Sequence, residues 1–225
     1  MSKAPLVYVV GSNFSVQKMF QERGFTTLLT NMYRNPATKP DLICFTGGED
    51  VSPGHYGEIK ITERNVHTHP LRDAQEIKMY ETFVNTPKVG ICRGGQLLNV
   101  LSGGALWQHV SGHAGDHEIT DLLFDQKIKV TSTHHQMMVP DKKGMVLAFA
   151  KNLGSEFTSG NSLATGKKVV RPIPDYEPEV VWYPHTLSLC YQPHPEYSFS
   201  RPGYGHTNYF FNLLNWAYDF PLKKD

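Results

Sequence analysis

Cys92 stands between glycines where an apolar stretch ends, in the segment Gly-Ile-Cys-Arg-Gly-Gly-Gln at 90–96. A nucleophile on a sharp turn from a strand into a helix needs small neighbours, because nearby Cβ atoms would clash with its strained backbone. Gly90 and Gly94 supply that room. The N-terminus of the helix expected after Cys92 also stabilises negative charge, which raises the thiolate fraction. The segment predicts a cysteine nucleophile, although by itself a buried core cysteine before a glycine turn would look the same.

A histidine and a glutamate follow another apolar run, in the segment Tyr-Gln-Pro-His-Pro-Glu at 191–196. A cysteine nucleophile needs an imidazole as base, and the imidazole needs a carboxylate that orients it. His194 and Glu196 come where the chain leaves a strand, so their side chains can reach a neighbouring loop. Alone, these residues are ordinary loop composition. Combined with Cys92, they predict a Cys-His-Glu triad.

A glycine pair supplies the third element of this chemistry. Attack on a carboxamide forms a tetrahedral oxyanion, which needs two preorganised N–H donors. The N–H of Arg93, at the start of the expected helix, offers one donor. Gly47 and Gly48 follow the apolar run 42–45, and a loop without side chains lets a backbone N–H approach as the second. Taken alone, the two glycines indicate only a turn.

Six histidines raise the question of a metal site: His109, His113, His117, His134, His135 and His194. Zinc sites recruit their ligands at regular spacings on defined elements. His109 and His113 have the i,i+4 spacing of a helical pair, but Gly112 and Gly115 disfavour a helix there. We therefore expect no metal and no cofactor. His117 and His134 are interpreted as structural or cleft-lining.

The first half of the chain alternates between strand-like and helix-like segments. Unbroken apolar runs suit strands that are covered on both faces, as in parallel sheets. Such runs lie at 6–10, 26–29, 42–45 and 89–91. Helices are expected from a cap at Ser12 or Asn13 to about Arg23, after Pro70, and after Cys92. This alternation predicts an α/β fold.

The second half is richer in strands. Apolar runs lie at 128–131, 146–150, 180–183 and 187–191. A final helix is expected over 207–218, where apolar residues recur at helical spacing. Residues 49–69 show little periodicity and are expected to form a long loop.

Length and composition restrict the class of protein. The 225 residues carry 22 Lys and Arg against 21 Asp and Glu, a net charge of +1, so no nucleic-acid partner that needs a basic face is expected. With 40% hydrophobic residues the chain can bury a core as one domain. The run at 6–10 is far too short to span a bilayer, and no secretory leader is visible. Three cysteines do not make a disulfide framework. We expect a cytoplasmic protein with no membrane partner, and Cys44 and Cys190 as buried core residues.

Further short motifs occur in order between residues 42 and 197. They are Gly-Gly-Glu-Asp-Val at 47–51, Tyr-Gly at 56–57, Arg72, Asp73 and Glu76, Gly-Gly-Ala-Leu-Trp-Gln at 103–108, His-His-Gln at 134–136, and Gln192 to Glu196. With the segment at 90–96, they resemble class I glutamine amidotransferase-like proteins. More narrowly they resemble the gamma-glutamyl-gamma-aminobutyrate hydrolase branch.

This resemblance implies a flavodoxin-like three-layer sandwich with a mostly parallel central sheet and extra strands in the second half. It implies a single domain of this class over residues 1–225. It also implies that Cys92 is the nucleophile, His194 the base and Glu196 the residue that orients it.

The same resemblance implies roles for five further residues. Gly48 and Arg93 would donate the oxyanion N–H groups. Gln96, His135 and Gly47 would help to hold the glutamyl group.

Three functions stay open at this point. The first is a cysteine-dependent hydrolase of a gamma-glutamyl amide, glutamine or a gamma-glutamyl amine, which forms a gamma-glutamyl thioester. The second is a glutaminase subunit that delivers ammonia to a separate synthetase, since no ATP-binding Gly-x4-Gly-Lys-Ser/Thr motif is present. The third is a non-catalytic scaffold, which would not need an intact triad.

Overall fold

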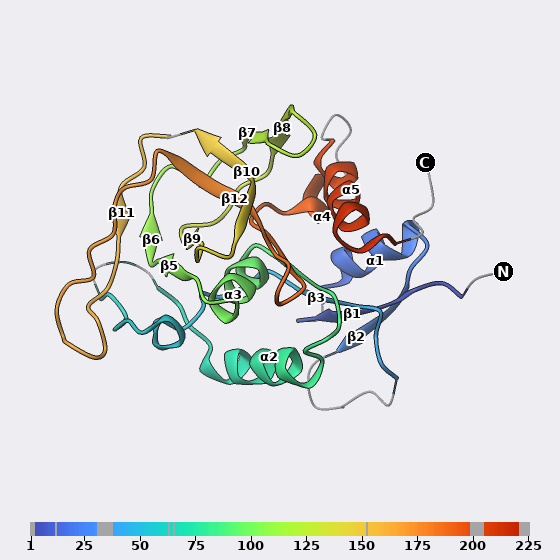
Figure 1. The fold of residues 1–225 in the computed structure, drawn as a ribbon, viewed down its shortest axis with the longest axis horizontal. Helices are drawn as coiled ribbons and strands as arrows, with labels where there is room; N and C mark the ends of the chain where they lie inside the picture. Colours follow the sequence, from blue (N-terminus) through green and yellow to red (C-terminus); the bar gives the residue numbers. More distant parts are fainter. Residues whose placement is uncertain are drawn as a thin grey trace.

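The structure is a computed structural model that describes residues 3–11, 13–30, 38–62, 64, 66–151, 153–198 and 205–220. Its elements are β1 (Leu6–Val10), α1 (Phe14–Glu22), β2 (Thr26–Thr30), β3 (Leu42–Phe45), the 3₁₀ helix η1 (Pro53–Tyr56), α2 (Pro70–Thr82), β4 (Lys88–Ile91), α3 (Arg93–Leu101), β5 (Ala105–Trp107), β6 (His109–Val110), β7 (His117–Asp121), β8 (Gln126–Val130), β9 (Met137–Val139), β10 (Met145–Lys151), β11 (Phe157–Thr158), β12 (Tyr176–Tyr183), β13 (Ser188–Tyr191), α4 (Pro195–Ser198) and α5 (His206–Tyr218). Figure 1 shows their arrangement.

A nine-stranded sheet runs through the molecule in the order β2-β1-β3-β4-β13-β12-β10-β7-β8. The first five strands are mutually parallel, and the last four join by antiparallel pairing. Two small two-stranded sheets, β11-β6 and β5-β9, lie outside it. Parallel strands end at the same edge of a sheet, and ligand sites of open α/β sheets form there. The loops after β3, β4 and β13 therefore meet at one edge.

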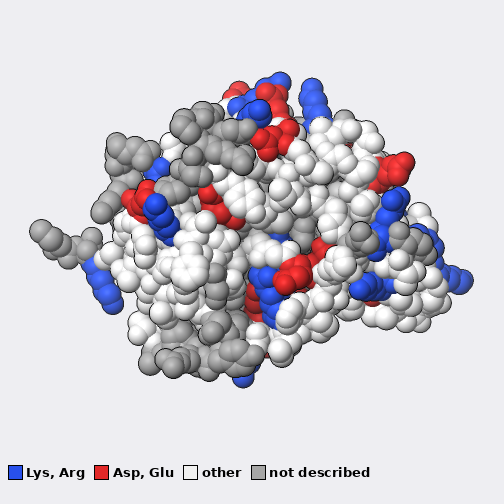
Figure 2. All heavy atoms as spheres, turned by 180° about the vertical axis from the view of Figure 1, so that it is seen from behind, with Lys and Arg blue, Asp and Glu red and all other residues white. Residues whose placement is uncertain are grey.

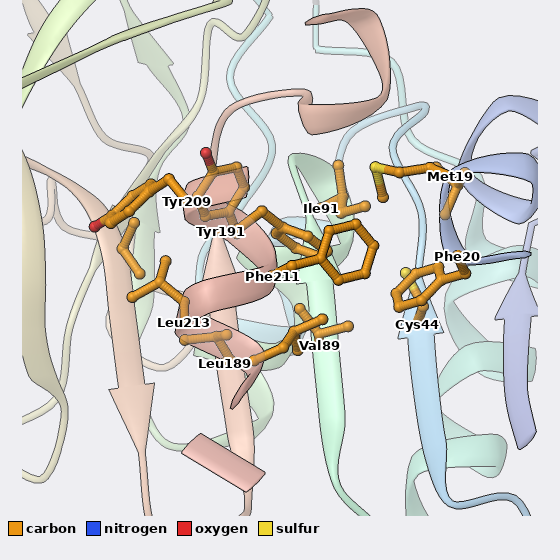
Figure 3. Close-up of a cluster of buried hydrophobic side chains, with 14 of the residues drawn as sticks. Met19, Phe20, Cys44, Val89, Ile91, Leu189, Tyr191, Tyr209, Phe211 and Leu213 are labelled. Carbon is orange, nitrogen blue, oxygen red and sulfur yellow. The ribbon is translucent and has the colours of Figure 1, made fainter. Parts of the chain in front are cut away.

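Both faces of β1, β3, β4 and β13 are buried, which explains why their sequences are rich in apolar residues, whereas the edge strand β2 is partly exposed. In β1, Val7 and Val9 pack with α1 and α5, whereas Tyr8 and Val10 pack on the opposite face with α2 and α3. The helices thus form a layer on each side of the sheet (Figure 1). Figure 3 shows the first of these cores, where Phe211 of α5 lies against the sheet between side chains of α1 and β13. The α/β, flavodoxin-like prediction is confirmed.

Asn13 caps α1, because its side chain accepts hydrogen bonds from the N–H groups of Ser15 and Val16. The alternative cap, Ser12, lies outside the described residues. The expected loop 49–69 is less irregular than predicted, since the 3₁₀ helix η1 and a bridge between Asp50 and Thr68 lie within it.

Five strands were not predicted: β5, β6, β7, β9 and β11. Each is two to five residues long. Strands this short carry too few alternations of apolar and polar residues to stand out from loops. In the longest of them, β7, Ile119 is the one apolar residue that is buried.

Acidic and basic side chains are mixed on the face of the molecule drawn in Figure 2, where small groups of both signs adjoin larger uncharged areas. This agrees with the net charge of +1. Among the described residues, no helix has the length and apolar character needed to cross a bilayer.

Candidate active site

Cys92 occupies the sharp turn between β4 and α3. It is one of four described non-glycine residues with positive φ, at φ 51° and ψ −113°, and it is the N-cap of α3. Strain of this kind costs energy and is concentrated at functional sites. A Cβ at Gly90 would clash with the backbone of Gly94 and Gly95, and one at Gly94 would clash with the backbone of Phe45. The glycines predicted to give room are therefore needed.

His194 and Glu196 form a buried pair after β13. Nδ1 of His194 lies 2.9 Å from Oε1 of Glu196, and both residues are buried. The ring of Tyr197 stacks on the imidazole with 4.5 Å between centroids and 9° between planes. With the carboxylate bonded to Nδ1, Nε2 of His194 is left to act on another group.

Thr131, which directly follows the edge strand β8, holds the backbone of His194. Its hydroxyl accepts a hydrogen bond from the N–H of His194 at 3.3 Å and donates one to the carbonyl of His194 at 3.1 Å. This contact was not predicted from the sequence, because 63 residues separate the two positions. It fixes the backbone at the residue that carries the imidazole.

The glycine loop after β3 brings the two ends of the site together. A Cβ built on Gly47 would lie 2.8 Å from Cε1 of His194 and 3.7 Å from Cβ of Cys92. The pKa of His194 is raised from 6.5 to about 11. Burial alone would lower it, but the hydrogen bonds and charges of Cys92 and Glu196 stabilise the protonated imidazole. The structure thus places Cys92, His194 and Glu196 within one interacting group.

A network of charges anchors the first residue of α3. The guanidinium of Arg93 is buried and pairs with the carboxylates of Asp73 and Glu76 in α2. Burial disfavours the cation and lowers the pKa of Arg93 to about 10, although Asp73 opposes this shift. The sequence indicates the two acidic residues only as members of a motif. The structure shows that their carboxylates hold the guanidinium of Arg93 in place.

Arg72 extends the same network to the glycine loop. Its Nη2 donates to the carbonyls of Gly47 at 2.9 Å and Thr46 at 3.2 Å, while its Nε donates to Oε1 of Glu76 at 2.8 Å. The guanidinium also occupies the space that a side chain on Gly48 would need, and Gly48 has φ +146°. Glu76 therefore connects the loop that carries Gly48 with the turn that carries Arg93.

A cavity of about 220 Å³ lies beside Cys92. Of the predicted site residues, it is lined by Gly48, Cys92, Arg93, Gln96 and His135. Gly47, His194 and Glu196 are not among its lining residues. The further lining residues are Glu49, Asp50, His67, Thr133, His134 and Gln136.

The two predicted substrate-binding side chains of this cavity have protein partners. Nε2 of Gln96 donates to the carbonyl of Gln136 at 3.0 Å and to Oε1 of Gln192 at 3.2 Å. Nε2 of His135 lies 3.0 Å from Oδ1 of Asp50, and this hydrogen bond raises the pKa of His135. The carboxylate of Asp50 thus favours the protonated form of His135 in the cavity wall.

The other two cysteines lie in the strands of the core. Cys44 in β3 and Cys190 in β13 are fully buried, and burial raises the pKa of each thiol well above its ordinary value. All three cysteines are free. The interpretation of Cys44 and Cys190 as core residues is confirmed.

A second, larger cavity of about 530 Å³ lies away from Cys92. Its walls are formed by β9 and the segment 171–176, and it contains none of the predicted site residues. Size alone would favour it as a binding site, but the groups capable of acyl transfer surround the smaller cavity.

Sequence reasoning missed the residues that hold the site together across the fold. The sequence marks Asp50, Arg72 and Glu76 as motif residues without a role, and it gives no signal for Thr131 or His67. Their partners are distant along the chain, so no local pattern reveals them. The glycines beside Cys92 did give a local signal, because their need for space is a property of one turn.

Comparison with known proteins gives a matching family and several similar proteins. Residues 28–163 match the model of the Peptidase C26 family. A protein of Lactococcus lactis named as a glutamine amidotransferase-like protein, YvdE, is 40% identical over 124 residues, 52% of this chain and 51% of the relative. A protein of Mycobacterium tuberculosis named as a glutamine amidotransferase, Rv2859c, is 33% identical over 127 residues, 47% of this chain and 41% of the relative. The chain spans about half the length of the curated relatives it matches.

Solved structures share the fold over nearly the whole chain. One, described as a GMP synthase subunit of Thermoplasma acidophilum, covers 98% of this chain and 97% of its own, with a TM-score of 0.65 and 14% identity. The PurLQS structure of Thermotoga maritima covers 95% and 99%, with a TM-score of 0.58 and 16% identity. These structures show the fold, and the curated relatives are named as glutamine amidotransferases or glutamine amidotransferase-like proteins. Since the family model covers more than half of the chain, the protein belongs to the Peptidase C26 family, within the class I glutamine amidotransferase superfamily.

Proposed function

We propose that the chain hydrolyses a gamma-glutamyl amide bond through a gamma-glutamyl thioester on Cys92. The observation that carries this proposal is the group formed by Cys92 on its strained turn and the buried His194–Glu196 pair. Cys92 and Glu196 both favour the protonated imidazole of His194, and the carboxylate of Glu196 keeps the imidazole in place.

In the first half-reaction the Cys92 thiolate attacks the gamma-carbonyl carbon, and a carbon–sulfur bond forms. The carbonyl oxygen becomes an oxyanion, which the N–H groups of Gly48 and Arg93 stabilise. Collapse of this intermediate breaks the carbon–nitrogen bond. The imidazolium of His194 gives its proton to the departing ammonia or amine, and the thioester remains.

In the second half-reaction water attacks the thioester. His194, now neutral, takes a proton from the water as the new carbon–oxygen bond forms. The carbon–sulfur bond then breaks, which restores the thiolate of Cys92 and the imidazolium of His194. The gamma-carboxyl group of glutamate is released, and no cofactor takes part.

The dimensions and charges of the cavity suit a small amino-acid substrate. Its volume of about 220 Å³ lies below the roughly 300–1,000 Å³ of pockets for larger ligands. His135 is the cation that we assign to the alpha-carboxylate of the glutamyl group. Glu49, which is half exposed at the rim, is the carboxylate that we assign to the alpha-ammonium group. Gln96 lies in the cavity wall beside the chain of the substrate, and Gly47 lies in the loop behind it.

The narrower assignment is to hydrolysis of gamma-glutamyl amines, as in the gamma-glutamyl-gamma-aminobutyrate hydrolase branch. The motifs from 47 to 196 support it, because they resemble that branch. The competing function is a glutaminase subunit that passes ammonia to a synthetase. The fold that the chain shares with a protein described as a GMP synthase subunit supports this alternative.

One steady-state assay separates the two functions. The purified chain is incubated with glutamine and with several gamma-glutamyl amines, without ATP or a second protein, and release of ammonia or amine is measured. The proposal requires turnover of at least one substrate, with none by Cys92→Ala. Absence of turnover by the chain alone, followed by strong activation when one synthetase is added, would favour the subunit instead.

A further inference from the structure

Three side chains from separate parts of the chain converge next to the active cavity. His113 lies between β6 and β7, His134 lies between β8 and β9, and Glu179 lies in β12. Their exposed fractions are 1%, 5% and 0%. One potential ligand atom from each lies within 4.8 Å of the others. The cluster is distinct from the triad, although His134 also lines the cavity beside Cys92.

The two separations measured from Glu179 are close to those of ligands around one small cation. Oε1 of Glu179 lies 3.5 Å from Nδ1 of His113 and 3.7 Å from Nε2 of His134. A tetrahedral zinc ion with ligands at about 2.0–2.1 Å places neighbouring ligand atoms roughly 3.3 Å apart. Because all three ligand atoms lie within 4.8 Å of one another, a closing movement of the side chains would bring the three groups onto one ion.

Each of the three side chains has a buried polar atom without a hydrogen-bond partner. These atoms are Nδ1 of His113, Nε2 of His134 and Oε2 of Glu179. Buried polar groups in folded proteins nearly always have a partner, and an unpaired one is costly. The two imidazole nitrogens face Oε1 of Glu179, and Oε2 of the same carboxylate has no partner either. Such a group of unpaired atoms indicates a shared partner that binds nitrogen and oxygen lone pairs.

The opposite side of each imidazole is held in the way that orients a metal ligand. Nε2 of His113 lies 2.5 Å from Oε2 of Glu177, and Nδ1 of His134 lies 2.9 Å from the carbonyl of Gln136. A carbonyl can only accept, so Nδ1 of His134 carries the hydrogen and Nε2 presents its lone pair to the cluster. A carboxylate or a carbonyl behind the ring is the usual support of a metal-bound histidine.

We propose that His113, His134 and Glu179 bind a zinc ion. Two imidazole nitrogens and one carboxylate oxygen are a donor set that zinc takes, with a fourth position left for water. His117, whose Nε2 lies 3.0 Å from Oε1 of Glu179, holds the carboxylate in place. This replaces the expectation of no metal, which considered only the spacing of histidines along the chain.

The ion would have a structural role, because it would link two segments in the wall of the cavity beside Cys92. It would join the segment before β9, which carries His135 and Gln136, to β12 at Glu179. The carbonyl of Glu179 accepts a hydrogen bond from the N–H of Gln192 at 2.8 Å, two residues before His194. Zinc would therefore stabilise the segments that carry the substrate-binding wall and the base, while the chemistry itself stays with Cys92.

The test uses the full chain carrying Cys92→Ala, so that the reactive thiol cannot bind the metal. The protein is freed of metal with a chelator, titrated with zinc against a chromogenic competitor, and its metal content is measured by mass spectrometry. We expect one equivalent, and a rise in the thermal midpoint on addition of zinc. Absence of tight binding by this protein would overturn the proposal.

Variants then locate the site in the same background. Glu179→Gln and His134→Gln should lose the tight equivalent and the thermal shift. His109→Gln is the matched control, because Nδ1 of His109 is also buried and unpaired but lies outside the cluster. Zinc binding that is equal in Glu179→Gln and His109→Gln would overturn the proposal.

A milder variant covers the case in which the ligand variants do not fold. Glu177→Gln keeps the size of the residue that supports His113 and should weaken zinc binding about 10–100-fold. Cobalt is the second probe, and its visible absorption in the metal-free protein should indicate a tetrahedral site without thiolate ligands. An unchanged affinity in Glu177→Gln, or a thiolate charge-transfer band, would refute the assignment.

Discussion

Gly47→Ala tests whether the glycine loop sets the position of the catalytic imidazole. The new Cβ would lie 2.8 Å from Cε1 of His194. An ordinary contact needs about 3.4 Å, so the two groups must separate by about 0.6 Å. His194 cannot turn aside easily, because Glu196 holds its Nδ1 at 2.9 Å and Tyr197 stacks on its face. Gly47 is not among the described glycines with positive φ, so alanine introduces no backbone strain.

The expected loss follows from the size of this shift. Misplacement of a reacting group by about 1 Å can cost on the order of 10²-fold in rate, so 0.6 Å should lower kcat/KM by roughly 10-fold, about 1.4 kcal/mol. The measurements are kcat/KM on the best gamma-glutamyl substrate and the rate at which iodoacetamide alkylates Cys92. The control is Gly54→Ala, where a Cβ meets nothing within 4 Å. If Gly47→Ala matched this control in both rates, the proposed contact between the loop and His194 would be wrong.

Four further changes test the other parts of the site. Cys92→Ala should abolish turnover and retain the fold. In the parent protein, peptide mapping should show alkylation at Cys92 and not at the fully buried Cys44. His194→Gln should remove nearly all activity, whereas Glu196→Gln should retain some, because the carboxylate orients the base and does not move the proton; the opposite order would reassign the base. The pKa of His194 in the folded protein is raised from 6.5 to about 11. The contribution of His194 to the free energy of unfolding is therefore complete below pH 6.5 and is lost as the pH rises through about 11. Denaturant titrations of the parent protein and of His194→Gln should accordingly give converging free energies of unfolding at alkaline pH. Arg72→Lys keeps the charge but loses the planar fork, so kcat should fall toward the roughly 10²–10³-fold cost of a lost oxyanion donor, with KM less affected; an unchanged kcat would show that Arg72 does not position the loop.

The parallel half of the sheet was predictable because its signals are local. The strands β1 and β3 are unbroken apolar runs, β2 and β4 contain shorter ones, and glycine or polar residues mark their ends. Residue types in one segment also indicated Cys92, whose turn is strained and requires Gly90 and Gly94. These features depend on sequence neighbours, so one chain without an alignment was sufficient to find them.

The contacts that position the site were not predictable in the same way. Thr131 holds the backbone of His194 across 63 residues, and His113 meets Glu177 across 64. Nothing in the local sequence of a threonine or a histidine indicates which distant strand it will face. The group formed by His113, His134 and Glu179 is an example. The spacing of the histidines along the chain predicted no metal site, and the three side chains come together only when β12 folds against the loops before β7 and β9.

The first two turns of α2 link the two proposed oxyanion donors. Arg72 binds the carbonyls of the loop that carries Gly48, whereas Asp73 and Glu76 hold the side chain of Arg93. Glu76 binds both Arg72 and Arg93, so a displacement of either arginine also disturbs the ion pair between Glu76 and the other one. An oxyanion hole is effective only if its donors are placed before the charge develops. A single rigid helix that fixes both donors meets this requirement, and it explains why Arg, Asp and Glu occur at 72, 73 and 76 on a segment that never reaches the cavity itself.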